Sequence, residues 1–331
     1  DGQLLVSAWG SGWIIVRDPM TGAEEYRLPQ LSSGIASITF VSGSSRWLVV
    51  GSIRKDCRIQ IYDLVSRTMV REMNTAHRDW TSGLVYSEVN DSLYSVSGDG
   101  MVQRWDYESG EMREMLLEPL TTRNLHGVAI DPSNRWLAAC GRNTSHTGDA
   151  HLWVWELKSQ RLILDLQLNR SLTSRDVAFG NGGLLAAATD SGAVQLFNLE
   201  DGTSTVLESG NAEIVSLCFD PTGEVLATGD WEGVIRLWDV SCQRQFLSLE
   251  AEGRVFSLEF SSDGKTLFAG MDEKAPSDRR FLRWDLTRFD RHIAGNLEEQ
   301  IRRVRARGEE PRNAAALRRW AEAVLSTDVS R

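Results

Sequence analysis

The hexapeptide VIRLWD at residues 234–239 reads as a short strand that ends in an aromatic residue followed by an acid. Short runs of this kind, bounded by turn residues, are typical of β-strands. Six further stretches follow the same pattern, with Arg in place of the aromatic residue in the first and Asn in place of the acid in the fifth: WIIVRD (13–18), RIQIYD (58–63), MVQRWD (101–106), HLWVWE (151–156), AVQLFN (193–198) and RFLRWD (280–285). The chain therefore contains seven copies of one strand.

The copies are evenly spaced. The acid or amide that ends each copy falls at positions 18, 63, 106, 156, 198, 239 and 285, which are 41 to 50 residues apart. Each interval has room for four short strands, the requirement of a propeller blade. The last interval shows their order: QFLSLE (245–250), RVFSLEF (254–260), TLFAG (266–270) and FLRWD (281–285), with the turn SSDG (261–264) after the second strand.

These repeats resemble the WD40 family over residues 1–286. The resemblance implies an all-β, seven-bladed β-propeller of four-stranded antiparallel sheets around a channel. Family members often bury a network of His, Ser or Thr, Asp and Trp in each blade. Only one repeat carries the whole set, so apolar packing is expected to hold the other blades; the four residues of that repeat are His77, Ser95, Asp99 and Trp105.

The two ends of the repeat array are incomplete. DGQLLVSAW at residues 1–9 aligns with DGKTLFAGM at 263–271, which places residue 1 in the turn before a blade's second strand. We therefore expect the first blade to lack its inner strand. The last blade is expected to lack its outer strand, because LTRFDRHIAGNLEEQ (286–300) does not alternate. Open sheet edges are usually avoided, so both strands are expected upstream in a longer protein; a natural start with an imperfect ring is the alternative.

Residues 287–331 change from strand-like to helical periodicity. Two short amphipathic helices are predicted there, one carrying Leu297 and Ile301 and a second beginning near Pro311. They either dock on the propeller or on each other, or present arginines to an acidic partner or RNA. The segment FDRHIAGNLEEQI (289–301) is similar to the tail of bacterial multidomain proteins in which WD40 repeats follow a serine/threonine kinase domain.

Composition limits the partners. The formal charge is -10, which repels nucleic acids and anionic membranes, and no apolar run is long enough to span a bilayer. The four cysteines have no paired spacing, which favours a reducing, cytoplasmic setting. These features predict a monomeric propeller within a longer chain, with protein or peptide partners and neither nucleic acid nor membrane as a partner.

Candidate catalytic groups are sparse. HRD at 77–79 matches the catalytic loop of protein kinases in letters only, since the rest of that signature is absent. His146, Asp149 and His151 offer metal-ligand types, but a turn and a strand start need not bring them together. The sequence predicts no catalytic residue, metal or cofactor; the polar residues that interrupt the inner strands are His126, Arg175, Asp176 and Glu259.

The resemblance also implies a binding face. In the family, partners usually meet the loops that enter the inner strands and the turns between the second and third strands. Trp and Arg are frequent in binding hot spots, although each Trp here can instead fold over its own blade. The predicted face comprises Trp9, Arg54, Lys55, Trp80, Asn124, Arg142, His146, Trp231 and Arg254.

The leading hypothesis is a non-catalytic protein-interaction scaffold, the partner-binding part of a larger bacterial signalling protein. A propeller enzyme with an active site in the channel is one alternative. A structural adaptor that acts through its helical tail is the other.

Overall fold

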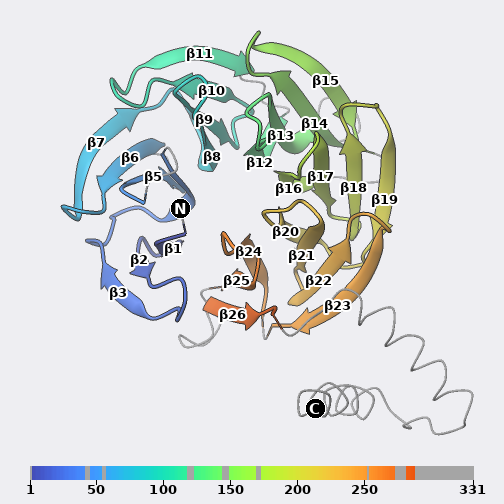
Figure 1. The fold of residues 1–331 in the computed structure, drawn as a ribbon. Coiled ribbons are helices and arrows are strands. Elements are labelled where there is room, and N and C mark those ends of the chain that lie inside the picture. Colours follow the sequence, from blue (N-terminus) through green and yellow to red (C-terminus); the bar gives the residue numbers. More distant parts are fainter. Residues whose placement is uncertain are drawn as a thin grey trace, which may run out of the picture. The chain divides into compact units, whose positions relative to one another are not determined.

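The computed structural model describes residues 2–41, 45–53, 57–117, 123–143, 149–168, 173–251, 253–272 and 281–287. Within these residues, 26 strands form seven antiparallel sheets arranged as a ring (Figure 1). Residues 1–287 form one compact unit. The helices predicted within 287–331 lie outside the described residues.

Sheets one to four have the following strands. The first sheet holds β1 (Leu5–Ala8), β2 (Ile14–Arg17) and β3 (Glu24–Arg27). The second holds β4 (Ile35–Phe40), β5 (Trp47–Ser52), β6 (Arg58–Asp63) and β7 (Thr68–Asn74). The third holds β8 (Thr81–Ser87), β9 (Ser92–Ser97), β10 (Val102–Trp105) and β11 (Met112–Leu117). The fourth holds β12 (Arg123–Ile130), β13 (Trp136–Asn143), β14 (Asp149–Glu156) and β15 (Arg161–Gln167).

Sheets five to seven continue the ring. The fifth holds β16 (Ser174–Phe179), β17 (Leu184–Thr189), β18 (Ala193–Asn198) and β19 (Ser204–Glu208). The sixth holds β20 (Ile214–Phe219), β21 (Val225–Asp230), β22 (Val234–Asp239) and β23 (Arg244–Glu250). The seventh holds β24 (Val255–Phe260), β25 (Thr266–Met271) and β26 (Phe281–Asp285). The predicted all-β, seven-bladed propeller with three strands in its first and last sheets is thus confirmed.

The core lies between the blades. Six clusters of buried apolar side chains fill the six junctions from the first sheet to the seventh, each cluster drawing on two neighbouring sheets. At the junction of the second and third sheets, for example, Ile59 and Met73 pack with Leu84 and Trp105. Among the described residues, no such cluster joins the seventh sheet to the first. The ring is therefore least well packed at this junction, which we call the seam.

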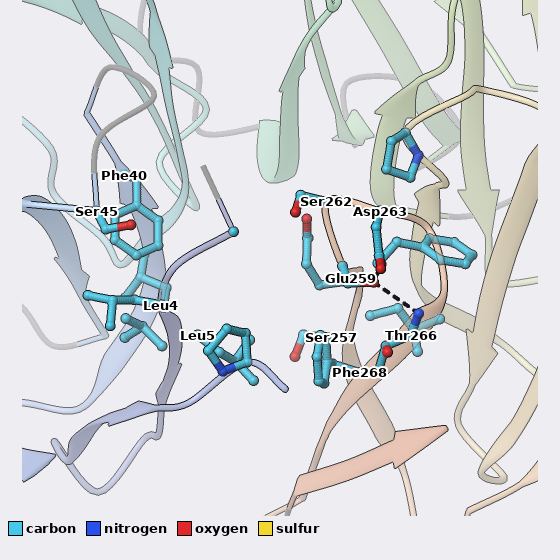
Figure 2. Close-up of a pocket in the computed structure, with 18 of the residues that line it drawn as sticks. Leu4, Leu5, Phe40, Ser45, Ser257, Glu259, Ser262, Asp263, Thr266 and Phe268 are labelled. Carbon is cyan, nitrogen blue, oxygen red and sulfur yellow. Dashed lines mark hydrogen bonds between the residues drawn. The ribbon is translucent and has the colours of Figure 1, made fainter. Parts of the chain in front are cut away.

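The seam contains a cavity of about 830 Å³. Figure 2 shows Leu5 and Phe40 on one side of it and Glu259 and Phe268 on the other. Farther out, the Arg17 guanidinium lies 5.0 Å from the centre of the Phe281 ring, a cation–π contact between the first and seventh sheets. The first sheet lacks an inner strand at this position. The cavity therefore lies where each of the other six sheets has its inner strand.

Each inner strand from β4 to β24 carries a β-bulge near its start. The bulge directs a side chain toward the next blade. Asp176 Oδ2 accepts a hydrogen bond from the Leu217 N–H at 2.9 Å, and Ser216 Oγ accepts one from the Leu258 N–H at 3.0 Å. These bonds fix neighbouring inner strands to each other, so the loops that leave them stand on a stiff base.

Candidate functional site

The four residues predicted to form a buried network lie together in the third sheet. His77 Nε2 lies 2.8 Å from Ser95 Oγ, which also accepts a 2.8 Å hydrogen bond from Trp105 Nε1. His77 Nδ1 lies 3.3 Å from Asp99 Oδ2. The network ties the loop before β8 to the body of its sheet, and Trp80 follows on that loop. Its role is structural because all four side chains are buried among the strands.

Backbone hydrogen bonds define the face on which the predicted binding residues lie. The Trp231 N–H donates to the Glu213 carbonyl at 2.9 Å, and the Asp272 N–H donates to the Arg254 carbonyl at 3.2 Å. These bonds join the residue before an inner strand to the turn after the second strand of the same sheet. Both sets of loops therefore lie at one end of the sheets, and we call this end the entry face.

Trp231, Arg254 and Phe256 meet on the entry face, and we call them the aromatic corner. The Arg254 guanidinium lies 4.3 Å from the centre of the Trp231 ring. The rings of Trp231 and Phe256 are 5.8 Å apart and inclined by 60°. Phe256 is 48% exposed. The corner joins the sixth sheet to the seventh and presents two aromatic rings and one cation at the surface.

Local sequence holds Trp231 in place. It begins the turn between β21 and β22, where Asp230 Oδ1 accepts hydrogen bonds from the N–H groups of Glu232 (3.0 Å) and Val234 (2.8 Å). Gly233 has a φ of 92°, a left-handed conformation that side chains rarely adopt. The Asp-Trp-Glu-Gly sequence thus specifies a tight turn that leaves the indole at its tip.

The other predicted tryptophans do not join this corner. Trp80 is 37% exposed and packs over Gly98 of its own sheet, since a Cβ at Gly98 would lie 2.5 Å from the indole nitrogen. Trp9 is partly buried beside the seam, with the Arg17 guanidinium 6.0 Å from its ring centre. Trp80 and Trp9 belong to the third and first sheets and pack beside residues of their own sheets, so neither reaches Trp231 of the sixth sheet.

The remaining predicted face residues are dispersed. Asn124 and Arg142 face each other as register partners on β12 and β13, and Arg142 is exposed. Arg54, Lys55 and His146 lie outside the described residues. Of the predicted residues, the structure brings Arg254 and Trp231 together and separately pairs Asn124 with Arg142.

Phe256 belongs to the site but escaped the sequence analysis. β24 pairs Val255 with Met271 and Ser257 with Gly270, so Phe256 is the extra residue of the bulge. Strict alternation cannot place a bulge residue, because the bulge shifts the register by one. Alternation alone places Phe256 on the same side as the buried Leu258 and Phe260, and the bulge is what exposes it.

The ionisable groups of the inner strands show what chemistry the channel offers. Burial raises the pKa of Asp176 to about 6, although the N–H groups of Leu217 and Val177 donate to its carboxylate. Glu259, on β24, is exposed and lines the seam cavity. Burial, with help from Arg175, lowers the pKa of His126 to about 4.

These groups do not assemble a reaction centre. Asp176 is already bonded to two backbone N–H groups. Burial raises the pKa of Cys218 well above its usual value and that of Cys140 to about 12, so both thiols stay protonated and poorly nucleophilic. In the part of the chain that the structure describes, no group of three or more His, Cys, Asp and Glu residues could hold a metal ion.

Comparison with known proteins places this geometry in a family. The profile of the WD domain, G-beta repeat, matches residues 203–239. This range includes β19, the last strand of the fifth sheet, and β20, β21 and β22 of the sixth sheet. The same four-strand unit recurs around the ring. The chain belongs to the WD40-repeat β-propeller family. The propellers of this family are usually non-catalytic and generally bind protein partners.

Individual WD40 relatives are distant. Guanine nucleotide-binding protein subunit beta of Saccharomyces cerevisiae is 21% identical over 313 residues, which cover 92% of this chain and 69% of the relative. Autophagy-related protein 16 of Arabidopsis thaliana is 26% identical over 203 residues, or 60% of this chain and 38% of the relative. Periodic tryptophan protein 2 of the same plant is 25% identical over 242 residues, or 72% and 24%. The chain therefore spans less than two fifths of the length of both plant relatives.

Membrane insertion through a helix finds no support in the described ranges. None of their segments forms a helix long and apolar enough to cross a bilayer.

Proposed function

We propose that this WD40 propeller is a protein-interaction scaffold that binds its partner through the entry face, centred on the aromatic corner. The observation that carries the proposal is the stacking of Arg254 on Trp231 beside the exposed ring of Phe256. Aromatic and arginine side chains dominate binding hot spots. Aromatic rings such as that of Trp bury much surface for little lost side-chain freedom. Here the inner-strand bulges and the tight turn at Trp231 hold them before a partner arrives.

The wider setting is proposed by analogy. One relative is a β-subunit of a guanine nucleotide-binding protein, and the tail sequence is similar to bacterial proteins that join WD40 repeats to a kinase domain. We propose that the propeller is the partner-recruiting part of a larger bacterial signalling protein and acts in the cytoplasm. The acidic composition supports protein partners over nucleic acids.

The test compares two faces of one molecule. Tagged wild-type chain and the variant W231A/F256A are used to capture partners under identical conditions. The matched control is V65S/V89S. Val65 and Val89 are 75% and 72% exposed, and both lie on turns at the end of the sheets opposite the entry face. We expect W231A/F256A to lose captured proteins that wild type and V65S/V89S both retain.

Folding must be separated from binding in this test. The melting temperatures of the three proteins are compared first, and we expect them to agree within a few degrees because all four side chains are partly or largely exposed. Equal capture by all three proteins would refute the entry face as the binding surface. Loss of capture only in V65S/V89S would assign binding to the opposite face.

A further inference from the structure

We propose that the aromatic corner recognises a peptide segment in which one carboxylate side chain lies next to an aromatic or large aliphatic side chain. This inference rests on the proposed function and names the chemistry of the partner. It depends on three observations: the contacts of the Arg254 guanidinium, the exposure of Phe256, and the pairing of Arg175 on another inner strand.

The Arg254 guanidinium contacts an aromatic ring, and its N–H groups have room for a further hydrogen-bond acceptor. Its guanidinium carbon lies over the Trp231 ring, 4.3 Å from the ring centre, which holds the group at this position. Its nearest carboxylate oxygen among the described residues is Asp272 Oδ2, 3.8 Å from Nη1 and beyond hydrogen-bond distance. The Arg254 side chain is 42% exposed. A partly exposed guanidinium held in place by an aromatic ring is suited to a two-point hydrogen bond with a carboxylate.

Phe256 and Trp231 supply the apolar half of the site. Their ring planes are inclined by 60°, so the two rings form a V-shaped apolar surface and do not stack. Phe256 is among the most exposed aromatic side chains of the described region, at 48%. An apolar side chain resting in this angle would cover both rings. Because Arg254 directly precedes β24 and Phe256 is its second residue, one short peptide segment can reach both.

The corner fits one carboxylate better than a phosphate. Arg175, which also lies beside the channel, is already paired with Glu213, with 2.5 Å between Nε and Oε1. Arg254, by contrast, has only the longer ion pair with Asp272, at 3.8 Å, among the described residues. Phosphate carries close to two negative charges and is usually held by several basic groups. The net charge of -10 also disfavours a doubly charged ligand.

The experiment uses the full chain labelled with ¹⁵N and four peptides whose termini are blocked. The peptides have the sequence Gly-Ser-Phe-X-Gly-Ser, with Asp, Asn or phosphoserine at X, and a fourth has Ala-Asp in place of Phe-Asp. Binding is followed by the indole N–H signal of Trp231, assigned by its disappearance in W231F. The Phe-Asp peptide should shift this signal in a saturable manner.

The expected differences are specific. Replacing Asp by Asn should weaken binding about tenfold or more, since a charge-assisted pair is lost. R254Q should weaken binding of the Asp peptide to the level of the Asn peptide. It should leave binding of the Asn peptide unchanged. F256A should weaken both peptides. R244Q, which removes an exposed arginine at the start of β23, at the opposite end of the sixth sheet, should change the binding of neither peptide.

Four results would overturn the inference: equal binding of the Asp and Asn peptides, equal effects of R254Q on both, tighter binding of the phosphoserine peptide, or no binding of any peptide at millimolar concentration. Each leaves the proposed function standing if W231A/F256A still loses its captured partners. If that variant retains them, the proposed function fails, whichever peptide binds.

Discussion

Ser95 offers a quantitative test of the buried network. In Ser95→Ala, Trp105 Nε1 and His77 Nε2 both lose the hydroxyl that lies 2.8 Å from each of them. Trp105 is 1% exposed and the His77 side chain is fully buried, so water cannot replace the hydroxyl. A buried polar group left unpaired costs about 1–3 kcal/mol. The substitution should therefore lower the free energy of unfolding by about 2–6 kcal/mol, the sum for two such groups.

The sixth sheet supplies the control. Thr228 Oγ1 accepts a 3.1 Å hydrogen bond from Trp238 Nε1, and no histidine takes part. Thr228→Val keeps the shape of the side chain and leaves only one indole N–H unpaired, so it should cost about 1–3 kcal/mol. Both variants are compared with wild type by urea unfolding, followed by tryptophan fluorescence.

The comparison is valid if the slope of the unfolding free energy against urea is unchanged, since a change in slope indicates a different unfolded or native state. The expected result is a midpoint displaced further by Ser95→Ala than by Thr228→Val. If Ser95→Ala costs no more than Thr228→Val, the histidine contributes nothing through this network and the reasoning is refuted.

Three further predictions concern the turns, the channel and the seam. Gly202→Ala should cost about 1 kcal/mol for its left-handed backbone, and Gly233→Ala clearly more in the same urea assay, because its Cβ would lie 2.4 Å from two carbonyl oxygens whereas Gly202 faces open space. Burial raises the pKa of Asp176 in the folded state from its usual 3.8 to about 6, so between about pH 4 and 6 the folded state binds more protons than the unfolded state. The free energy of unfolding should therefore fall as the pH rises through this range. Asp176→Asn should flatten that part of the pH profile of the unfolding free energy, and an unchanged slope would contradict the assignment. A peptide with the sequence of β20 (residues 214–219) should raise the melting temperature by pairing with β1 in the seam cavity, whereas a version with a central proline should have no effect.

Sequence reasoning predicted the features that depend on local order along the chain. Seven sheets follow from the 41- to 50-residue spacing because strand alternation and turn residues act over a few positions. The buried network was implied by the resemblance to WD40 repeats, whose residue types one repeat carries at His77, Ser95, Asp99 and Trp105, and a single blade contains all four.

The aromatic corner could not be predicted, because it depends on contacts between residues of two different blades. Trp231 belongs to the sixth sheet, whereas Arg254 and Phe256 belong to the seventh, so their meeting depends on how two blades pack. Phe256 also sits in a bulge, where alternation misplaces side chains. Trp9 could not be placed from its turn alone, because its surroundings are set by the seam between the first and last sheets.

The central claim is that the entry face, at the aromatic corner, is the binding surface. The most direct measurement is hydrogen exchange of the whole chain, alone and with a captured partner. Binding at the corner predicts slower exchange in the segments around residues 229–234 and 253–258, with no change in the opposite turns around residues 64–67 and 88–91. Protection of those opposite turns, with none around residues 229–234 and 253–258, would contradict it.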